Sequence, residues 1–174
     1  MFRKAAAGLV LVAVLSAVSQ PIPAEGDSLT VLTINVWSGL DYRGSLKMGE
    51  YEEKLAFIQR VAGSSPAILL GDFNALADSE EIGLLRQAGF LHVFELAGSG
   101  EGFTWDADGN PNIQLQRRAY PDEVPEDPRN KRIDYIFVRG SGLRVTGARV
   151  VLDRPLNGQY PSDHYGVLAE IEVR

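Results

Sequence analysis

AILLGDFN occupies residues 67–74 of a chain of 174 residues. Its first half, Ala67 to Leu70, is a short apolar run that predicts a buried strand. Gly71, Asp72 and Asn74 follow at once, and these residue types favour turns, so a plain turn explains them. Because binding groups often lie in loops held by a rigid strand, the segment also indicates a functional site.

Three further segments place an acid, an amide or an imidazole beside an apolar run. They are Ile34-Asn35-Val36, Arg132-Ile133-Asp134-Tyr135 and Ser162-Asp163-His164. Leaving one such group buried without a partner costs about 1–3 kcal/mol. Together with residues 71–74, they indicate strand ends that converge on a shared polar site.

Each segment also has an ordinary explanation. Asn35 suits a strand edge or a turn cap, and residues 162–164 suit a capped turn. Asp134 is harder to explain in this way, because acids are disfavoured in β-branched and aromatic runs. Residues 162–164 do not form a Ser-His-Asp triad, since three consecutive side chains lack the relay geometry and the chain has no Gly-x-Ser-x-Gly elbow.

The residue types of these segments suit the hydrolysis of a phosphate ester. Carboxylate and amide oxygens are hard ligands for Mg²⁺ or Mn²⁺. Such an ion neutralises charge on the phosphoryl oxygens and on the leaving group. An imidazole held by a carboxylate activates water or stabilises the charged phosphorus centre.

Composition excludes several other classes of protein. The length allows one domain of ordinary size. The chain has 17 Lys and Arg against 23 Asp and Glu, a formal net charge of −6, which excludes a generally basic nucleic-acid surface and leaves room for a local basic patch. It has no Cys, which excludes disulfides, thiolate zinc sites and a Cys nucleophile. An imidazole mechanism must therefore use one of its two histidines, His92 or His164.

The N-terminus predicts export. Arg3 and Lys4 precede an apolar run, Ala5 to Val18, that is short for a bilayer span, and small and turn-forming residues follow up to Ala24. We therefore expect a signal peptide over residues 1–24, one domain over residues 25–174, and a secreted or periplasmic mature chain. An uncleaved anchor is the alternative, and no later stretch predicts a membrane span.

The rest of the pattern predicts the order β, α, β, α and then mostly strands. Residues 98–131 are rich in Gly, Pro and Asp and are expected to form a long loop. Residues 106–110 within it only faintly resemble a calcium loop, because the acid of the twelfth position is missing. The expected strands are 29–36, 67–70, 133–138, 143–152 and 166–173, and the expected helices are 50–61 and one that is capped by Asp78 with Glu81 and ends at Gly89.

These segments resemble the endonuclease/exonuclease/phosphatase family, the deoxyribonuclease I-like metal phosphodiesterases. Residues 71–74 and 162–164 carry the resemblance as a pair, and Gly102-Phe103-Thr104-Trp105 ahead of residues 132–135 adds to it. The resemblance implies a layered α/β/β/α sandwich of two packed mixed sheets, with the site at one edge. It also implies a hydrolase, dependent on Mg²⁺ or Mn²⁺, of phosphodiesters or phosphomonoesters. The substrate would be a nucleic acid, which the net charge does not favour, a phospholipid or a small phosphoester.

The same resemblance implies a role for each catalytic residue. Asp72 would align the attacking water or assist the leaving group, and Asn74 would hydrogen-bond the phosphoryl oxygens. Asp134 would orient His164 through its ring N–H. His164 would act as general base or as electrostatic partner of the phosphate.

The metal and substrate contacts follow in the same way. Asn35 and Asp163 would contribute to the metal site. Arg117, Arg118 and Arg132 are candidate contacts to phosphate oxygens. A solvated loop with scattered ion pairs explains these three arginines at least as well.

The chain departs from the family between Asn35 and Asp72. That interval contains no Gln-Glu pair and no His, where the family has a metal-ligating Glu and a further catalytic His. Its glutamates, Glu50, Glu52 and Glu53, fit the solvated start of a helix better than a metal site. We therefore expect a missing internal block joined near residues 49–54, an incomplete first sheet and weakened metal binding. A catalytically impaired or non-catalytic domain of the same fold is the alternative function.

Overall fold

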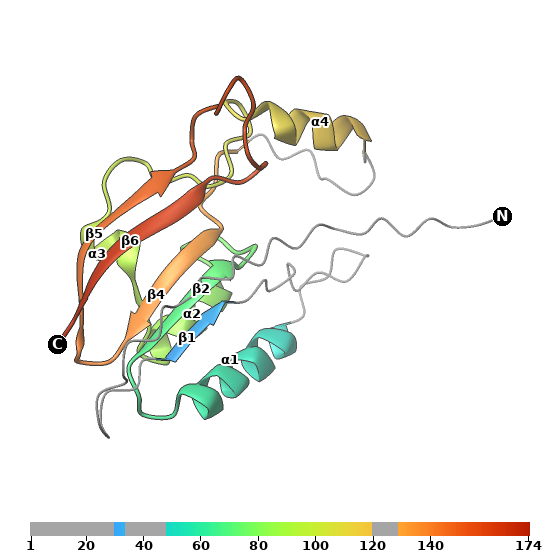
Figure 1. Cartoon of the computed structure of the whole chain (residues 1–174). Helices are drawn as coiled ribbons and strands as arrows, with labels where there is room; N and C mark the ends of the chain where they lie inside the picture. The colour runs from blue at the N-terminus through green and yellow to red at the C-terminus, as the bar shows by residue number, and fades with distance from the viewer. Residues whose placement is uncertain (1–29, 34–47, 120–128) are drawn as a thin grey trace.

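The computed structural model describes residues 30–33, 48–119 and 129–174. Within them, one sheet has the strand order β1-β2-β4-β3 and a second sheet pairs β5 with β6 (Figure 1). The strands are β1 (Thr30–Thr33), β2 (Ala67–Asp72), β3 (Leu91–His92), β4 (Asp134–Arg139), β5 (Leu143–Val151) and β6 (Gly166–Val173). The helices are α1 (Met48–Ala62), α2 (Glu80–Gln87), α3 (Val93–Ala97) and α4 (Pro111–Ala119).

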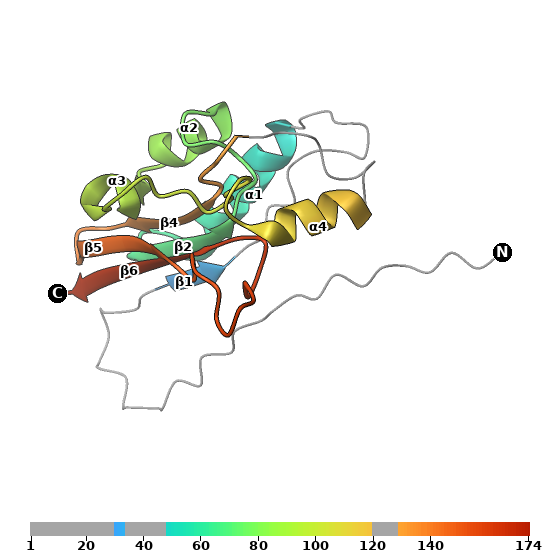
Figure 2. The same ribbon diagram turned by 90° about the horizontal axis from the view of Figure 1, so that it is seen from above.

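The central strands β2 and β4 bury side chains on both faces of the first sheet. Leu69 and Phe137 point into a cluster that α1 and α2 complete, whereas Ile68 and Val138 point into a second cluster shared with β5 and β6. This division follows from the strand period of two residues. The result is a helical layer, the first sheet and the second sheet in succession (Figure 2).

The structure confirms the mixed α/β architecture with two packed sheets. The expected helix over residues 50–61 lies within α1, and β6 has the bounds that the pattern predicts. β2 extends past Leu70 to include Gly71 and Asp72, which pair with Tyr135 and Asp134. Residues 29 and 34–36 of the first expected strand lie outside the described residues.

The N-cap prediction for α2 was wrong by one residue. Ser79, and not Asp78, caps the helix: its backbone is extended and its Oγ accepts a hydrogen bond from the Ile82 N–H at 3.4 Å. Glu81, predicted as the reciprocal partner, is 5% exposed inside the helix. The predicted end is correct, because Gly89 has φ of 83°, a left-handed conformation that glycine adopts without strain.

The expectation of only strand and loop beyond Gly89 was also wrong. Residues 93–97 form α3, and residues 111–119 form α4 inside the expected long loop. The start of α4 has a sequence signal: Asn110 Oδ1 accepts a hydrogen bond from the Asn112 N–H at 3.1 Å, and Pro111 occupies the first helical position. Asn at the N-cap and Pro directly after it are the preferred residues there.

No helix in the described ranges combines the length and the apolar character needed to cross a bilayer.

Phe73 holds the turn after β2 against the core, and its removal tests that anchor. It is 2% exposed and meets the rings of Tyr135 and Phe137 edge-on at 5.7 and 5.4 Å. We expect Phe73→Ala to lower the free energy of unfolding by about 3–5 kcal/mol, because the core cannot fill the cavity. Urea unfolding measures this loss in the free energy of unfolding. The control, Leu115→Ala at a 58% exposed position, should change stability by no more than about 0.5 kcal/mol.

Candidate functional site

The register of β2 and β4 brings two carboxylates together. The strands are antiparallel, and Asp72 is paired with Asp134. Both residues alternate in phase with Ile68 and Val138, so both lie on the face that the second sheet covers. Side chains opposite each other in an antiparallel pair have Cβ atoms about 4.5–5.5 Å apart. The two acids therefore lie side by side where the two sheets meet.

Asp72 is held by the turn that follows it. Its Oδ1 accepts a hydrogen bond from the Asn74 backbone N–H at 2.8 Å, and its Oδ2 accepts one from the Asn74 side-chain amide at 2.7 Å. This turn needs Asn74 at φ of 49°, in the left-handed region where Asn is better tolerated than most residues. The Phe73 N–H donates to the Ile133 carbonyl at 2.8 Å, which ties the turn to the start of β4.

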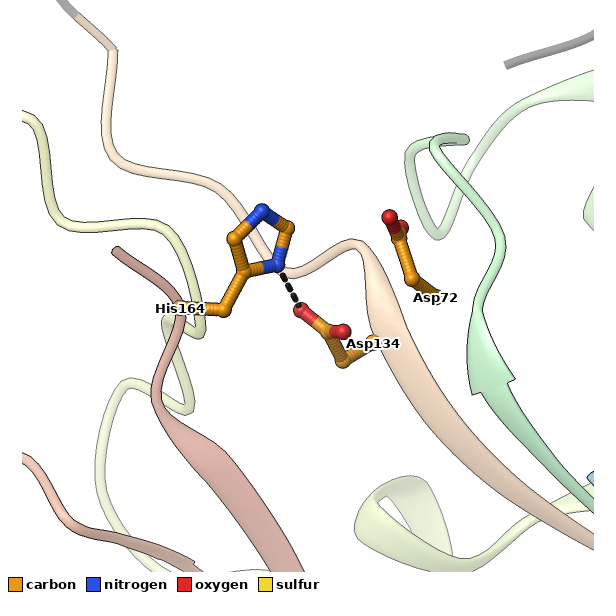
Figure 3. Close-up of side chains that lie close together, drawn as sticks. All are labelled: Asp72, Asp134 and His164. Atoms are coloured by element: carbon orange, nitrogen blue, oxygen red, sulfur yellow. Dashed lines mark hydrogen bonds and ion pairs between the residues drawn. The ribbon is translucent and has the colours of Figure 1, made fainter. Parts of the chain in front are cut away.

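His164 completes the group from the loop that leads into β6. Its Nδ1 lies 2.8 Å from Asp134 Oδ2, and the Asp72 carboxylate stands beside this pair (Figure 3). The His164 and Asp134 side chains are only 22% and 20% exposed. Because Nδ1 is engaged by Asp134, the second ring nitrogen, Nε2, is left to act on a substrate. The structure thus forms the Asp134–His164 pair that the sequence predicts.

Burial and the neighbouring charges shift the pKa values of Asp72 and His164. Burial, together with the charge of Asp134, raises the pKa of Asp72 to about 6, although His164 and Asn74 oppose the shift. Burial alone would lower the pKa of His164, but the hydrogen bond and charge of Asp134, with the charges of Asp72 and Asp163, raise it to about 9. His164 is therefore a cation at neutral pH in the metal-free protein.

Asp72, Asp134 and His164 also form a group able to hold a metal ion. One ligand atom from each lies within 4.8 Å of the others. The donor chemistry fits a divalent cation, because burial and, after it, repulsion from the Asp134 carboxylate raise the pKa of Asp72. A bound cation would relieve that repulsion. Among the described residues, no other acid, His or Cys belongs to this group.

Thr104 and Trp105 support the pair, and residue types alone did not single them out. Thr104 is fully buried, and its Oγ1 accepts hydrogen bonds from the backbone N–H groups of Ile133 and Asp134 at 3.1 and 3.2 Å. The Thr104 carbonyl accepts the Tyr165 N–H at 2.7 Å. Trp105 meets the His164 ring edge-on, with centroids 5.0 Å apart. The signal for these contacts was the Gly-Phe-Thr-Trp segment, which served only as part of a resemblance.

Of the two predicted metal ligands, the structure describes only Asp163. Asp163 lies next to His164 and raises its pKa, while its Oδ1 accepts a hydrogen bond from Ser162 Oγ at 3.1 Å. Its carboxylate is outside the three-residue group. Asn35 lies outside the described residues. Glu52 and Glu53 are exposed on α1, as the helix-start interpretation predicts.

The three candidate substrate arginines lie in α4 and in the loop before β4. The Arg132 guanidinium donates to the Gly102 and Glu101 carbonyls at 2.8 and 2.7 Å and lies 4.0 Å from the centroid of the Phe94 ring. It therefore fastens the loop before β4. Arg117 and Arg118 lie in the last turn of α4.

His92 is packed in the core. It is 2% exposed, and its ring lies 4.9 Å from the Tyr135 ring. Burial lowers its pKa. It takes no part in the group formed by Asp72, Asp134 and His164.

Comparisons of the sequence and of the structure with known proteins agree on one family. The profile of the Endonuclease/Exonuclease/phosphatase family matches residues 10–164. Tyrosyl-DNA phosphodiesterase 2 of Bos taurus is 27% identical over 166 residues, which cover 87% of this chain and 41% of that protein. The chain thus spans less than half the length of this relative.

Solved structures share the fold. TDP2 of D. rerio, complexed with a single-strand DNA product, aligns with a TM-score of 0.53 and 23% identity over 71% of this chain and 50% of that one. The mannosyl-6-phosphatase of Bacteroides thetaiotaomicron aligns with a TM-score of 0.53 and 20% identity over 82% and 50%. An endonuclease/exonuclease/phosphatase family protein of Leptotrichia buccalis aligns with a TM-score of 0.55 and 23% identity. The alignment covers 87% of this chain and 52% of that one.

The proton on His164 makes stability depend on pH. The pKa of His164 is raised from 6.5 to about 9. Protonated His164 therefore contributes fully to the free energy of unfolding below pH 6.5, and this contribution is lost as the pH rises through 9. We expect the free energy of unfolding of the metal-free protein to fall by about 2–3 kcal/mol between pH 6.5 and 9. Urea unfolding in a chelator measures this slope. His164→Gln should flatten it, whereas His92→Gln should keep it, because the pKa of His92 is lowered.

Proposed function

The chain belongs to the endonuclease/exonuclease/phosphatase family, and from that premise we propose that it hydrolyses phosphate esters with the help of Mg²⁺ or Mn²⁺. One observation carries the proposal: the Asp134–His164 pair and the Asp72–Asn74 turn lie together where the two sheets meet. An imidazolium, an acid and an amide are the groups needed to bind a phosphate ester and to direct water at it.

His164 acts on the phosphoryl oxygens. With Nδ1 on Asp134 and a proton on the ring at neutral pH, Nε2–H donates a hydrogen bond to a phosphoryl oxygen. This bond strengthens as negative charge builds up on the oxygens in the transition state. Of the two roles that the sequence left open, the metal-free site therefore supports the electrostatic one.

Asp72 and Asn74 act on the water and the phosphate. The pKa of Asp72, about 6, leaves it largely ionised at neutral pH and close to the range where a carboxylate accepts a proton from water. Asn74 uses one amide hydrogen on Asp72 Oδ2. Because an amide NH₂ has two donors, the other hydrogen is available to a phosphoryl oxygen.

The metal ion would be held by carboxylate oxygens of Asp72 and Asp134, to which the resemblance adds Asn35 and Asp163. Bound there, Mg²⁺ or Mn²⁺ supplies positive charge that polarises the phosphoryl group and neutralises the leaving oxygen.

The substrate is a phosphodiester or a phosphomonoester. The relatives carry names of both kinds, tyrosyl-DNA phosphodiesterase and mannosyl-6-phosphatase. The net charge of −6 disfavours tight binding of a DNA duplex, since release of counterions supplies most non-specific affinity. A small phosphoester, a phospholipid or a short single strand suits this chain better than a duplex.

A non-catalytic domain of the same fold is the second candidate. It is favoured by the length of the match, 41% of the curated relative, and by the interval before β2, which lacks the Gln-Glu pair and the His of the family. Such a domain would bind a divalent ion or a phosphate ester without turning it over.

Export is a separate proposal. The basic start, the apolar run up to Val18 and the small residues up to Ala24 support a cleaved signal peptide and a secreted or periplasmic product.

Activity is tested on a panel of substrates, with and without chelator. The panel contains bis-p-nitrophenyl phosphate, p-nitrophenyl phosphate, sphingomyelin and a single-strand oligonucleotide with a 5′-phosphotyrosyl end. We expect Mg²⁺-dependent product release on at least one substrate. Asp72→Ala and His164→Ala should each lower kcat/KM by about 10²–10⁴-fold, because each removes a group that acts on the phosphate or the water. Glu170→Ala, at an exposed ion pair on β6, is the matched acidic control.

Turnover that survives the chelator, or that is unchanged in both variants, would contradict the proposal. A folded chain that binds Mg²⁺ by titration calorimetry but hydrolyses nothing on the panel would support the non-catalytic candidate instead.

Export is tested by expressing the full chain in a Gram-negative bacterium and measuring the intact mass of the product. We expect a periplasmic protein that begins after Ser19 or Ala24. A product that keeps Arg3 and Lys4 and pellets with membranes would establish the uncleaved anchor.

A further inference from the structure

Asn110 is a fully buried amide whose side chain bonds to the loop before His164. Its Nδ2 donates to the Ser162 carbonyl at 2.9 Å and lies 3.1 Å from the Asp163 carbonyl. Its Oδ1 accepts the Asn112 N–H at 3.1 Å. A buried amide with its donors and its acceptor all engaged fixes the backbone that it touches.

Asn112 adds a second amide from the same place. Its Nδ2 donates to the Tyr160 carbonyl at 3.1 Å and to the Ser162 carbonyl at 3.2 Å. The start of α4 therefore holds three carbonyls of the stretch from residue 160 to residue 163.

Most of the loop on that side is exposed to solvent. Residues 152–159, which lead from β5 into it, are all exposed, as are Pro161 and Ser162. On the other side of His164, the Tyr165 N–H is fixed by the Thr104 carbonyl at 2.7 Å. The backbone on either side of His164 is thus fixed by hydrogen bonds from two separate segments, in addition to the stacking of Tyr160 on Tyr165 and the hydrogen bond from the His164 N–H to Ser162 Oγ.

We propose that Asn110 is a positioning residue for His164: its amide holds the Ser162 and Asp163 carbonyls so that His164 Nδ1 stays on Asp134. This inference rests on the proposed function, because it assigns Asn110 a part in the hydrolysis without contact with the substrate. Asn112 contributes to the same restraint through Tyr160 and Ser162.

A cap for α4 is the plainer role of Asn110, and the two roles use different atoms. Capping uses Oδ1, which accepts the Asn112 N–H. Positioning uses Nδ2, which faces the loop. Asn110→Ser separates them, since Ser caps helices well but has no NH₂ group to reach the two carbonyls.

The first measurement needs no activity. The chain has two histidines, so the ring N–H proton of His164 can be assigned in ¹⁵N-histidine-labelled protein by its loss in His164→Gln. In the wild type we expect a downfield, slowly exchanging Nδ1–H resonance, as a ring N–H bonded to a carboxylate gives. Asn110→Ser should broaden or abolish it while thermal melting still shows a folded protein.

The second measurement is kinetic, on bis-p-nitrophenyl phosphate or whichever panel substrate the wild type hydrolyses. We expect Asn110→Ser to lower kcat by about 10–100-fold with KM changed less than about twofold, because the group that acts in the transition state is misplaced while binding is retained. Asn112→Ala keeps the backbone cap and should act in the same direction with a smaller effect. It also serves if Asn110→Ser does not fold.

Gln114→Ala is the matched control. Gln114 is also on α4, and its amide donates to the Ala107 carbonyl at 3.0 Å, away from the His164 loop. It should leave the resonance and kcat unchanged. A wild-type resonance and kcat in folded Asn110→Ser and Asn112→Ala would overturn the inference. Failure of Asp72→Ala and His164→Ala to affect turnover would instead overturn the proposed function, and the resonance would still decide the role of Asn110.

Discussion

The site depends on the register between β2 and β4. Because side chains alternate along a strand, a slip of one residue would move Asp134 to the face covered by α1 and α2, away from Asp72 and His164. Burial prevents this slip: Leu69 and Phe137, paired in the same register, fill the helix-covered cluster. The Tyr135 hydroxyl, within hydrogen-bond distance of the Ala75 and Arg132 carbonyls, adds a polar restraint on the same alignment.

That register sets two carboxylates against each other, so the protein must balance like charges. Asn74 donates two hydrogen bonds to Asp72, and the Nδ1–H of protonated His164 donates one to the Asp134 carboxylate. A bound divalent ion would offset the negative charge of both carboxylates. The charges of the site thus affect the stability of the fold. In the metal-free protein the neighbouring carboxylates favour a protonated His164, and a bound metal ion would lower the pKa of His164 by supplying positive charge in its place.

Local sequence patterns predicted most of the fold and identified the acids of the site. Strand alternation located β2, β4, β5 and β6, and the acid or imidazole beside each apolar run identified Asp72, Asp134 and His164. The Asn-Pro start of α4 was a local signal that the Gly-rich composition around it concealed.

Tertiary contacts limited the rest of the prediction. The hydrogen bond from Asn110 to Ser162 spans 52 positions, and no periodicity encodes it. Charge alone left open whether Arg132 contacts substrate, and the structure shows its guanidinium engaged by two loop carbonyls and the Phe94 ring. A cation in a loop gives the same local pattern whether it binds a phosphate or fastens its own backbone.

Among the described residues, the hydrogen bonds around the site lie after residue 66. They join residues 72–75, 104–112, 131–135 and 160–165, whereas α1 adds apolar packing to the far face of the first sheet through Ile58 and Ala62. In the part of the chain that the structure describes, the group that could hold a metal ion also contains the Asp134–His164 pair, so a change at Asp134 would act on the position of His164 and on metal affinity together.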